Sequence, residues 1–184
     1  MNKVYTIFAE LLKLCPRYQF EKATEHYRGN RYVKTFTTWQ QYGNTKVLAE
    51  ALTEGAREGG AEVNLINTNE RRVTLKEFLA ADAVAIGTPN YFSYIAGTIK
   101  TFFDDIYLWD QSGESVKGKP AVLFYSHGTG GGTVKQPFES LAHRFFQQVG
   151  ETVSSGRPIS DEAKKKCHTL GKELVKDLDK GIDK

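Results

Sequence analysis

The sequence predicts an α/β fold built on a parallel sheet of five strands that alternate with helices. Three observations lead to this prediction. From residue 32 onward, short segments with strand character alternate with segments of helical periodicity, as expected for parallel strands joined by right-handed crossovers. Residues 121–125 (AVLFY) are apolar throughout, which is typical of a strand buried on both faces. Turn-forming or glycine-rich loops follow three of the expected strands.

Composition and length agree with an ordinary globular protein. The chain has 184 residues, of which 40% are hydrophobic and 26% charged, and this excludes a wholly disordered or collagen-like chain. No apolar run approaches the roughly 20 residues of a membrane span, and the first residues lack the apolar stretch of a signal peptide. Cys15 and Cys167 have no metal-binding spacing, so we expect reduced thiols in a cytoplasmic protein.

Residues 1–41 differ in composition from the rest of the chain. They carry seven Lys or Arg and three Asp or Glu, whereas residues 42–184 carry 18 and 19. They also hold eight of the 22 aromatic residues. Apolar spacing predicts one helix from Ile7 to Cys15, ended by Pro16, and a second short helix around Phe20 to Tyr27. We therefore expect a helical extension over residues 1–31, followed by a domain over 32–184. A surplus of four positive charges is too small to indicate nucleic-acid binding.

The first half of the domain contains three expected strands. Tyr32 to Trp39 is rich in β-branched and aromatic residues and predicts the first strand. A helix is expected over Thr45 to Glu58, since Gly59-Gly60 gives a stop signal. The alternation then continues with a strand, a short helix and a strand, over residues 62–66, 75–81 and 83–86.

The second half repeats the alternation twice. Apolar residues from Ile95 to Ile106 mark a helix before the strand at 121–125. Another helix is expected from Phe138 to Val149, with Phe145 on its apolar face, before a weak fifth strand at Glu151 to Ser154. The last helix starts at Ser160, a favourable N-cap, and its apolar stripe runs to Leu178.

Ligands of parallel sheets bind outside the carboxyl ends of the strands, where the strand order reverses. The loop after the first strand, Gln40 to Thr45, contains Gly43 and runs directly into a helix. Its amides and the helix N-terminus could face a phosphate. The alternative is that Gly43-Asn44-Thr45 is only a helix cap.

The other two loops could enclose a planar ring. Residues 87–94 (GTPNYFSY) offer three aromatic side chains, which could stack on a ring or pack into the core. Residues 126–132 (SHGTGGG) leave the backbone bare, which suits either close approach to a ligand or a loose surface loop. His127 could titrate near neutral pH or be a bystander. Together the three loops indicate a planar, phosphorylated ligand.

From about Tyr42 to Leu178 the chain resembles flavodoxin-like FMN-binding proteins. YGNTKVLAEAL is similar to that family's phosphate loop and first helix, and SHGTGGG to its third flavin loop. GTPNYF and the following AGTIKTFFDD are similar to the second loop and its helix, particularly in the quinone oxidoreductases called tryptophan-repressor-binding proteins. In that group an aromatic residue near the flavin often occupies the place of Leu108-Trp109. The resemblance implies a flavodoxin-like three-layer sandwich with a five-stranded parallel sheet.

The resemblance also implies non-covalent FMN as the cofactor. No Ser/His/Asp triad, metal-ligand cluster or spaced pair of catalytic carboxylates is found in the sequence. We therefore expect no catalytic side chain and no metal. The residues implied for cofactor binding come from the three loops: Gln40, Gln41, Tyr42, Gly43, Asn44 and Thr45; Thr88, Pro89, Asn90, Tyr91 and Phe92; and Ser126, His127, Gly128, Thr129 and Gly130.

The chain departs from this family before Tyr42. Residues 1 to about 41 resemble the N-terminal segment of certain insertion-sequence transposases, which suggests a chimera whose first strand has been replaced. The substitute strand places Lys34 where the family has a central, buried strand. An unpaired buried ammonium is costly, so we expect Lys34 to lie at a strand end or the strand to fit poorly.

Three functions remain open at this point. The first is an FMN-binding electron carrier, and the second is an NAD(P)H:quinone oxidoreductase. Carriers are usually strongly acidic, whereas residues 42–184 have a net charge near −1. The third is a chimeric remnant with an impaired flavin site. The expected partners are a redox protein or a small quinone, and NAD(P)H in the second case. Nucleic acid and membrane are not expected, and a homo-oligomer remains open.

Overall fold

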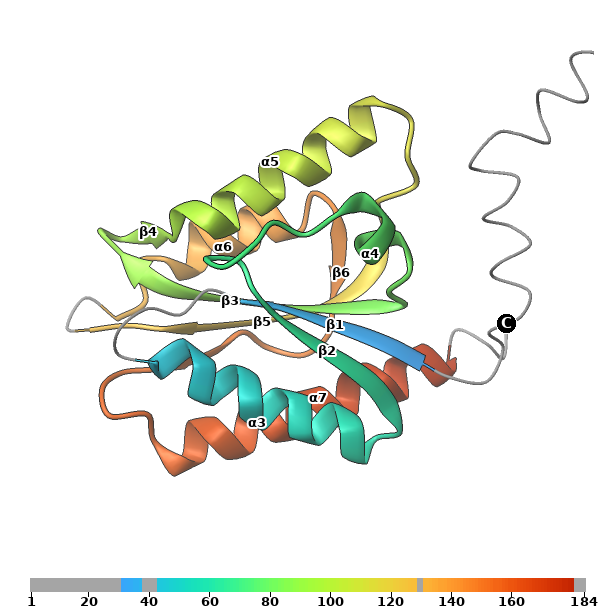
Figure 1. Cartoon of the computed structure of the whole chain (residues 1–184). Coiled ribbons are helices and arrows are strands. Elements are labelled where there is room, and N and C mark those ends of the chain that lie inside the picture. Colours follow the sequence, from blue (N-terminus) through green and yellow to red (C-terminus); the bar gives the residue numbers. More distant parts are fainter. Residues whose placement is uncertain (1–30, 38–42, 129–130, 181–184) are drawn as a thin grey trace, which may run out of the picture. The chain divides into compact units, whose positions relative to one another are not determined.

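The chain divides into two units, Met1–Asn30 and Arg31–Lys184. A computed structural model describes residues 31–37, 43–128 and 131–180, all in the second unit (Figure 1). The helices expected within residues 1–31, and Cys15 with them, lie outside the described residues. The same holds for Gln40, Gln41, Tyr42, Thr129 and Gly130.

The sheet has the parallel architecture that the sequence predicts. Its order is β2 (Ala61–Asn67), β1 (Arg31–Thr37), β3 (Ala83–Tyr91) and β5 (Lys119–Ser126), followed by two short strands beside β5. These strands are all parallel to their neighbours. A further short strand, β4 (Tyr94–Ile95), returns antiparallel to the end of β3. The flavodoxin-like α/β fold expected above is therefore confirmed.

The fifth strand differs from its prediction because it is split. β6 (Phe146–Gln148) pairs with the start of β5 and β7 (Val153–Ser155) with its end. The expected helix to Val149 is wrong, since α6 (Lys135–Ala142) stops seven residues earlier than Val149. The Phe146 ring lies 6.1 Å from the Phe78 ring and 6.5 Å from the Phe103 ring, so core packing requires extended chain here.

Helices cover both faces of the sheet (Figure 1). On one face α3 (Asn44–Glu58) and α7 (Asp161–Lys180) enclose a core with β1, β2 and β5. On the other face α4 (Leu75–Leu79), α5 (Gly97–Gln111) and α6 enclose an aromatic-rich core. Among the described residues, no helix is both long enough and apolar enough to cross a bilayer. The described part of the chain also places no three His, Cys, Asp or Glu side chains together as a metal site.

The helices α3 and α7 touch backbone to backbone at two glycines. A Cβ on Gly55 would lie 2.7 Å from the carbonyl carbon of His168. A Cβ on Gly171 would lie 2.7 Å from the backbone nitrogen of Ala56. Real Cβ atoms essentially never approach closer than 3.0 Å. Only glycine therefore permits this close contact, and the contact fixes α3 on the sheet.

The short helix α4 is held by a capping box. The Thr74 hydroxyl accepts from the Glu77 backbone N–H, and the Glu77 carboxylate accepts from the Thr74 backbone N–H. The Arg71 guanidinium also donates to Glu77, at 2.7 and 2.9 Å. These bonds, chiefly the one to Arg71, lower the pKa of Glu77 to about 2.

The first strand, β1, is well paired in its backbone. β1 pairs along its length with β2 and over Val33 to Thr37 with β3, and Val33 is fully buried. Lys34 stands opposite Asn64 and Val84, in the middle of the strand. The expectation that Lys34 lies at a strand end, or that the strand fits poorly, is therefore wrong for the backbone. Ladder hydrogen bonds form between main-chain groups and do not depend on the side chain. The Lys34 side chain is outside the described residues.

Candidate cofactor-binding site

The ends of three strands lie together at the carboxyl edge of the sheet, and each leads into one of the loops expected to bind a ligand. These loops follow β1, β3 and β5, which are neighbours in the sheet. Thr37 at the end of β1 stands opposite Gly87, and Pro89 stands opposite Ser126 at the end of β5. The structure thus brings together the strand ends from which the three loops singled out in the sequence start.

The first loop leads into the open N-terminus of α3. Gly43 adopts a left-handed backbone conformation, with φ of 63°, and its missing Cβ faces open space. No side chain caps α3, and no acidic residue lies in its first turn. A helix N-terminus of this kind presents N–H groups and partial positive charge, which suit a phosphate.

A pair of hydroxyl groups joins this helix to the third loop. The Thr45 and Ser126 hydroxyl oxygens lie 2.7 Å apart, and both residues are buried. Asn44, between Gly43 and Thr45, is half-buried at the first position of α3. The pair fixes the start of α3 against the end of β5.

In the second loop, Thr88 and Pro89 support the site from within the protein. Thr88 is fully buried, and its hydroxyl donates to the Pro89 carbonyl at 2.9 Å and accepts from the Ala96 N–H at 3.0 Å. Pro89 is also buried and has no N–H to offer. The two residues hold the start of α5 rather than presenting side chains to a ligand.

Asn90 connects the second loop to the third. Its amide nitrogen donates to the Thr133 hydroxyl at 3.0 Å. Its amide oxygen is buried and has no hydrogen-bond partner among the described residues. Thr133 was not predicted as a site residue, and its place just after the glycine run was the only signal.

The tip of the second loop is a tight hairpin that displays an aromatic ring. Tyr91 pairs with Tyr94, and Phe92 and Ser93 between them both have positive φ, of 50° and 65°. Such angles suit Asn-Gly and are strained for Phe and Ser. Phe92 is fully exposed and Tyr94 is partly exposed, so neither packs into the core. An exposed ring on a constrained turn suits stacking on a planar ligand.

The third loop leaves its main chain accessible. Added Cβ atoms on Gly128 and Gly132 would meet nothing within 4 Å. The His127 backbone N–H donates to the Ser155 carbonyl at 3.0 Å, and its ring nitrogen Nδ1 lies 2.7 Å from the Gly128 carbonyl oxygen. Gly156, just after β7, lies against the His127 ring: a Cβ there would be 3.4 Å from its Cε1.

The charge at this edge is neutral to positive. No Asp or Glu occurs in residues 38–46, 87–99, 126–135 or 156–160. Burial raises the pKa of Tyr91, and the positive charge of Arg157 opposes this rise. Arg157 follows β7 and was missed from the sequence, because the fifth strand was expected to be a single weak strand.

The expectation that Leu108-Trp109 lies near the cofactor is wrong. Trp109 packs against Phe78 in the core, with ring centroids 5.8 Å apart. It lies twelve residues beyond Gly97, so the rise of an α-helix carries it about 18 Å away from the carboxyl edge. Leu108 is exposed at the same remote end.

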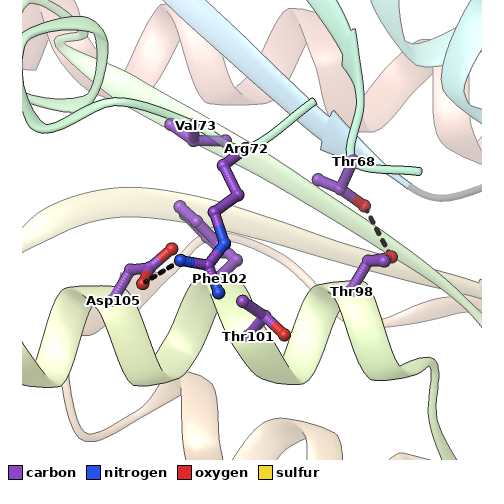
Figure 2. Close-up of a pocket in the computed structure, with 7 residues that line it drawn as sticks. All are labelled: Thr68, Arg72, Val73, Thr98, Thr101, Phe102 and Asp105. Carbon is purple, nitrogen blue, oxygen red and sulfur yellow. Dashed lines mark hydrogen bonds and ion pairs between the residues drawn. The ribbon is translucent and has the colours of Figure 1, made fainter. Parts of the chain in front are cut away.

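A small cavity lies beside this site, between the loop after β2 and α5 (Figure 2). Its volume is about 120 Å³, well below the 300–1,000 Å³ of typical ligand pockets. Arg72 and Asp105 form an ion pair of 3.9 Å across it, and the Thr68 and Thr98 hydroxyls lie 3.0 Å apart. The remaining lining residues are Val73, Thr101 and Phe102. The cavity separates two packed elements and is too small for a flavin.

Two family models match parts of the chain. The family described as Flavodoxin matches residues 38–173, and a domain of unknown function (DUF4372) matches residues 3–47. The flavodoxin match therefore starts just after β1.

Individual relatives agree with the longer match. A flavodoxin of Aquifex aeolicus (strain VF5) is 36% identical over 151 residues, covering 72% of this chain and 80% of that protein. A flavodoxin of Clostridium beijerinckii is 28% identical over 139 residues, covering 74% and 95%. Among solved structures, a flavodoxin from the domain Archaea superposes with a TM-score of 0.68 at 19% identity, covering 80% of this chain and 99% of that one.

Proposed function

The chain belongs to the flavodoxin family, and from this premise we propose that it binds FMN non-covalently and carries electrons through the flavin. The observation that carries the proposal is the uncapped N-terminus of α3, opened by Gly43 at the meeting point of three loops. The bare backbone of the glycine loop gives the second half of the site.

The phosphate belongs at the first loop. Backbone N–H groups at Gly43, Asn44 and Thr45 suit it, and no carboxylate in the first turn of α3 repels it. Gln40, Gln41 and Tyr42 complete this loop in the sequence and lie outside the described residues. The hydrogen bond between the Thr45 and Ser126 hydroxyls holds the start of α3 against the end of β5, next to this phosphate position.

The flavin ring belongs between the second and third loops. Tyr91 and Phe92 offer aromatic surface on one side, and Ser126, His127 and Gly128 offer main-chain groups on the other. Thr129 and Gly130 continue that second wall in the sequence. Thr88, Pro89 and Asn90 hold the hairpin in place. When bound, FMN supplies the redox chemistry, and the protein binds and orients it and limits its contact with water.

The described cysteine takes no part in this chemistry. Cys167 is free and buried, and burial raises the pKa of its thiol to about 12. A thiolate is the reactive form of cysteine, so electrons pass through the flavin and not through this thiol. A reduced thiol also agrees with our proposal of a cytoplasmic protein.

A second candidate is the NAD(P)H:quinone oxidoreductase. Its support is that the site loops contain no carboxylates. An electron carrier that docks to a basic redox protein generally relies on acidic residues, so their absence favours a small-molecule acceptor. With Trp109 placed in the remote core, the aromatic expected beside the flavin no longer favours it. Steady NADPH-dependent reduction of benzoquinone by the FMN-loaded protein supports this candidate, and its absence leaves the electron carrier.

An FMN titration of the purified full chain tests the proposal. We expect quenching of flavin fluorescence with a sub-micromolar Kd, or about −8 kcal/mol or better. Gly43→Asp provides a matched variant, since it places a carboxylate and a strained φ at the phosphate position, and it should lose most of the affinity. A colourless protein that cannot be loaded with FMN would support the chimeric remnant instead. That remnant would fit our proposal that residues 1 to about 41 come from a mobile element.

A further inference from the structure

The positive charge at the carboxyl edge has a structural source. Arg157 is the only Lys or Arg in the loop between β7 and α7, residues 156–160. β7 runs beside the end of β5, so that Ser155 stands opposite Ser126. Arg157 is thus two residues beyond the strand end, next to the loop that would hold one side of the ring.

Arg157 lies beside both walls of the site. A Cβ added to Gly156, its neighbour, would lie 3.4 Å from the ring of His127 in the third loop. On the opposite wall, the charge of Arg157 acts on the phenol of Tyr91 in the second loop. Its side chain is exposed.

Two acidic side chains follow Arg157 in the sequence, and both pair with lysines. Asp161 and Glu162 begin α7, four and five residues further on, and both are exposed. Each already pairs with a lysine of its own helix, Lys164 at 2.9 Å and Lys166 at 2.6 Å. In the site loops themselves the sequence contains no Asp or Glu.

Resting on the proposed function, we infer that Arg157 sets the redox potential of the bound flavin by stabilising its reduced, negatively charged form. Two electrons and one proton convert the neutral oxidised ring into an anion with one negative charge. A nearby guanidinium favours that anion over the neutral ring, because it cannot lose its own proton. The protein therefore binds reduced FMN more tightly, relative to oxidised FMN, than it would without Arg157. Arg157 acts on the flavin only through its positive charge and takes no part in proton transfer.

The test compares binding of the two forms of FMN. The Kd of oxidised FMN and, under anaerobic conditions with dithionite, of reduced FMN are measured at pH 8 for the full chain and for Arg157→Gln. In Arg157→Gln we expect the Kd of reduced FMN, divided by the Kd of oxidised FMN, to rise about tenfold. This rise equals a fall of about 30 mV in the midpoint potential of a two-electron couple. Arg157→Lys keeps the charge and should keep most of the ratio.

Arg144→Gln is the matched control. Arg144 is exposed and lies before β6, at the opposite, amino edge of the sheet, where Phe146 pairs with Lys119. Its removal lowers the net charge equally and should leave the ratio unchanged. An equal change in Arg144→Gln and Arg157→Gln, or no change in either, would overturn the inference.

Two further results keep the test independent of the variants and of the proposed function. In the unsubstituted protein, raising the salt concentration should shift the same ratio in the direction of Arg157→Gln, because salt screens exposed charges. A ratio that does not respond to salt contradicts the inference even if Arg157→Gln does not fold. Failure of the unsubstituted chain to bind FMN at all refutes the proposed function instead.

Discussion

Replacing Gly171 by alanine tests the contact on which the position of α3 depends. An added Cβ would meet the backbone of α3 at Leu52, Ala56 and Gly55, and the distance to the Ala56 nitrogen would be 2.7 Å. Backbone atoms cannot rotate away as a flexible side chain can, so the two helices must separate or bend. We therefore expect Gly171→Ala to lower the free energy of unfolding.

The size of the effect follows from two opposing contributions. Overpacking of a core costs about 1–3 kcal/mol and occasionally more, and contact with main chain belongs at the upper end. Alanine in place of glycine gains about 1 kcal/mol within a helix. The net loss is about 2 kcal/mol, which lowers Tm by about 4–8 °C in a chain of this size.

Urea unfolding followed by circular dichroism measures the loss. Gly97→Ala is the control, since Gly97 begins α5 and a Cβ there would meet nothing within 4 Å. This control should be neutral or slightly stabilising. If Gly171→Ala is as stable as Gly97→Ala, the helices do not make the close contact, and the argument for how α3 is fixed fails.

Three further predictions concern the site and the capping box. Thr45→Val should cost about 1–2 kcal/mol of stability, because it leaves the buried Ser126 hydroxyl unpaired; a double-mutant cycle with Ser126→Ala should show a coupling, and simple additivity would contradict the pair. Replacing Phe92 and Ser93 by Asn and Gly should raise the free energy of unfolding by about 1 kcal/mol or more, since it relieves two strained φ angles. The affinity for FMN should fall, because the stacking ring is lost. A variant that gains both stability and FMN affinity would show that Phe92 does not stack on the flavin. For Glu77, whose pKa falls from 4.5 to about 2 on folding, the stabilisation is present above pH 4.5 and is lost as the pH falls toward 2. The stability difference between the unsubstituted protein and Glu77→Gln should therefore shrink over that range in urea melts, and a constant difference would refute the linkage.

The sequence predicted the fold well because its signals were local and repeated. The apolar run at 121–125 and the stops at Gly59-Gly60 correspond to buried β5 and to the end of α3. The split of the fifth strand was not predictable in the same way. Phe145 fits a helix stripe by spacing alone, and only the contacts of the neighbouring Phe146 ring with the distant Phe78 and Phe103 rings favour extended chain here.

The sequence indicated which strand ends lie together at the carboxyl edge, and it was less informative about single side chains. Glycines at Gly43 and Gly128 mark where backbone is open, which a sequence can reveal. Thr88 was named as a ligand-facing candidate, yet its hydroxyl is used inside the protein by a hydrogen bond to Ala96. Arg157 was missed because its importance depends on β7 running beside β5, a long-range pairing without a local motif.

The place of β1 in the sheet also has a consequence for how the protein is made. β1 precedes the other described strands in the chain, yet it pairs on both sides, with β2 thirty residues later and β3 fifty residues later. Once the chain has grown past Tyr91, the half-sheet β2-β1-β3 has all its strands. The apolar face of α3, however, is covered by α7, whose residues 161–180 are synthesised after all the described strands. Because domains fold as units during synthesis, α3 remains uncovered until α7 has been synthesised. A chain truncated before Asp161 would thus contain its central strands but expose the apolar face of α3 to chaperones.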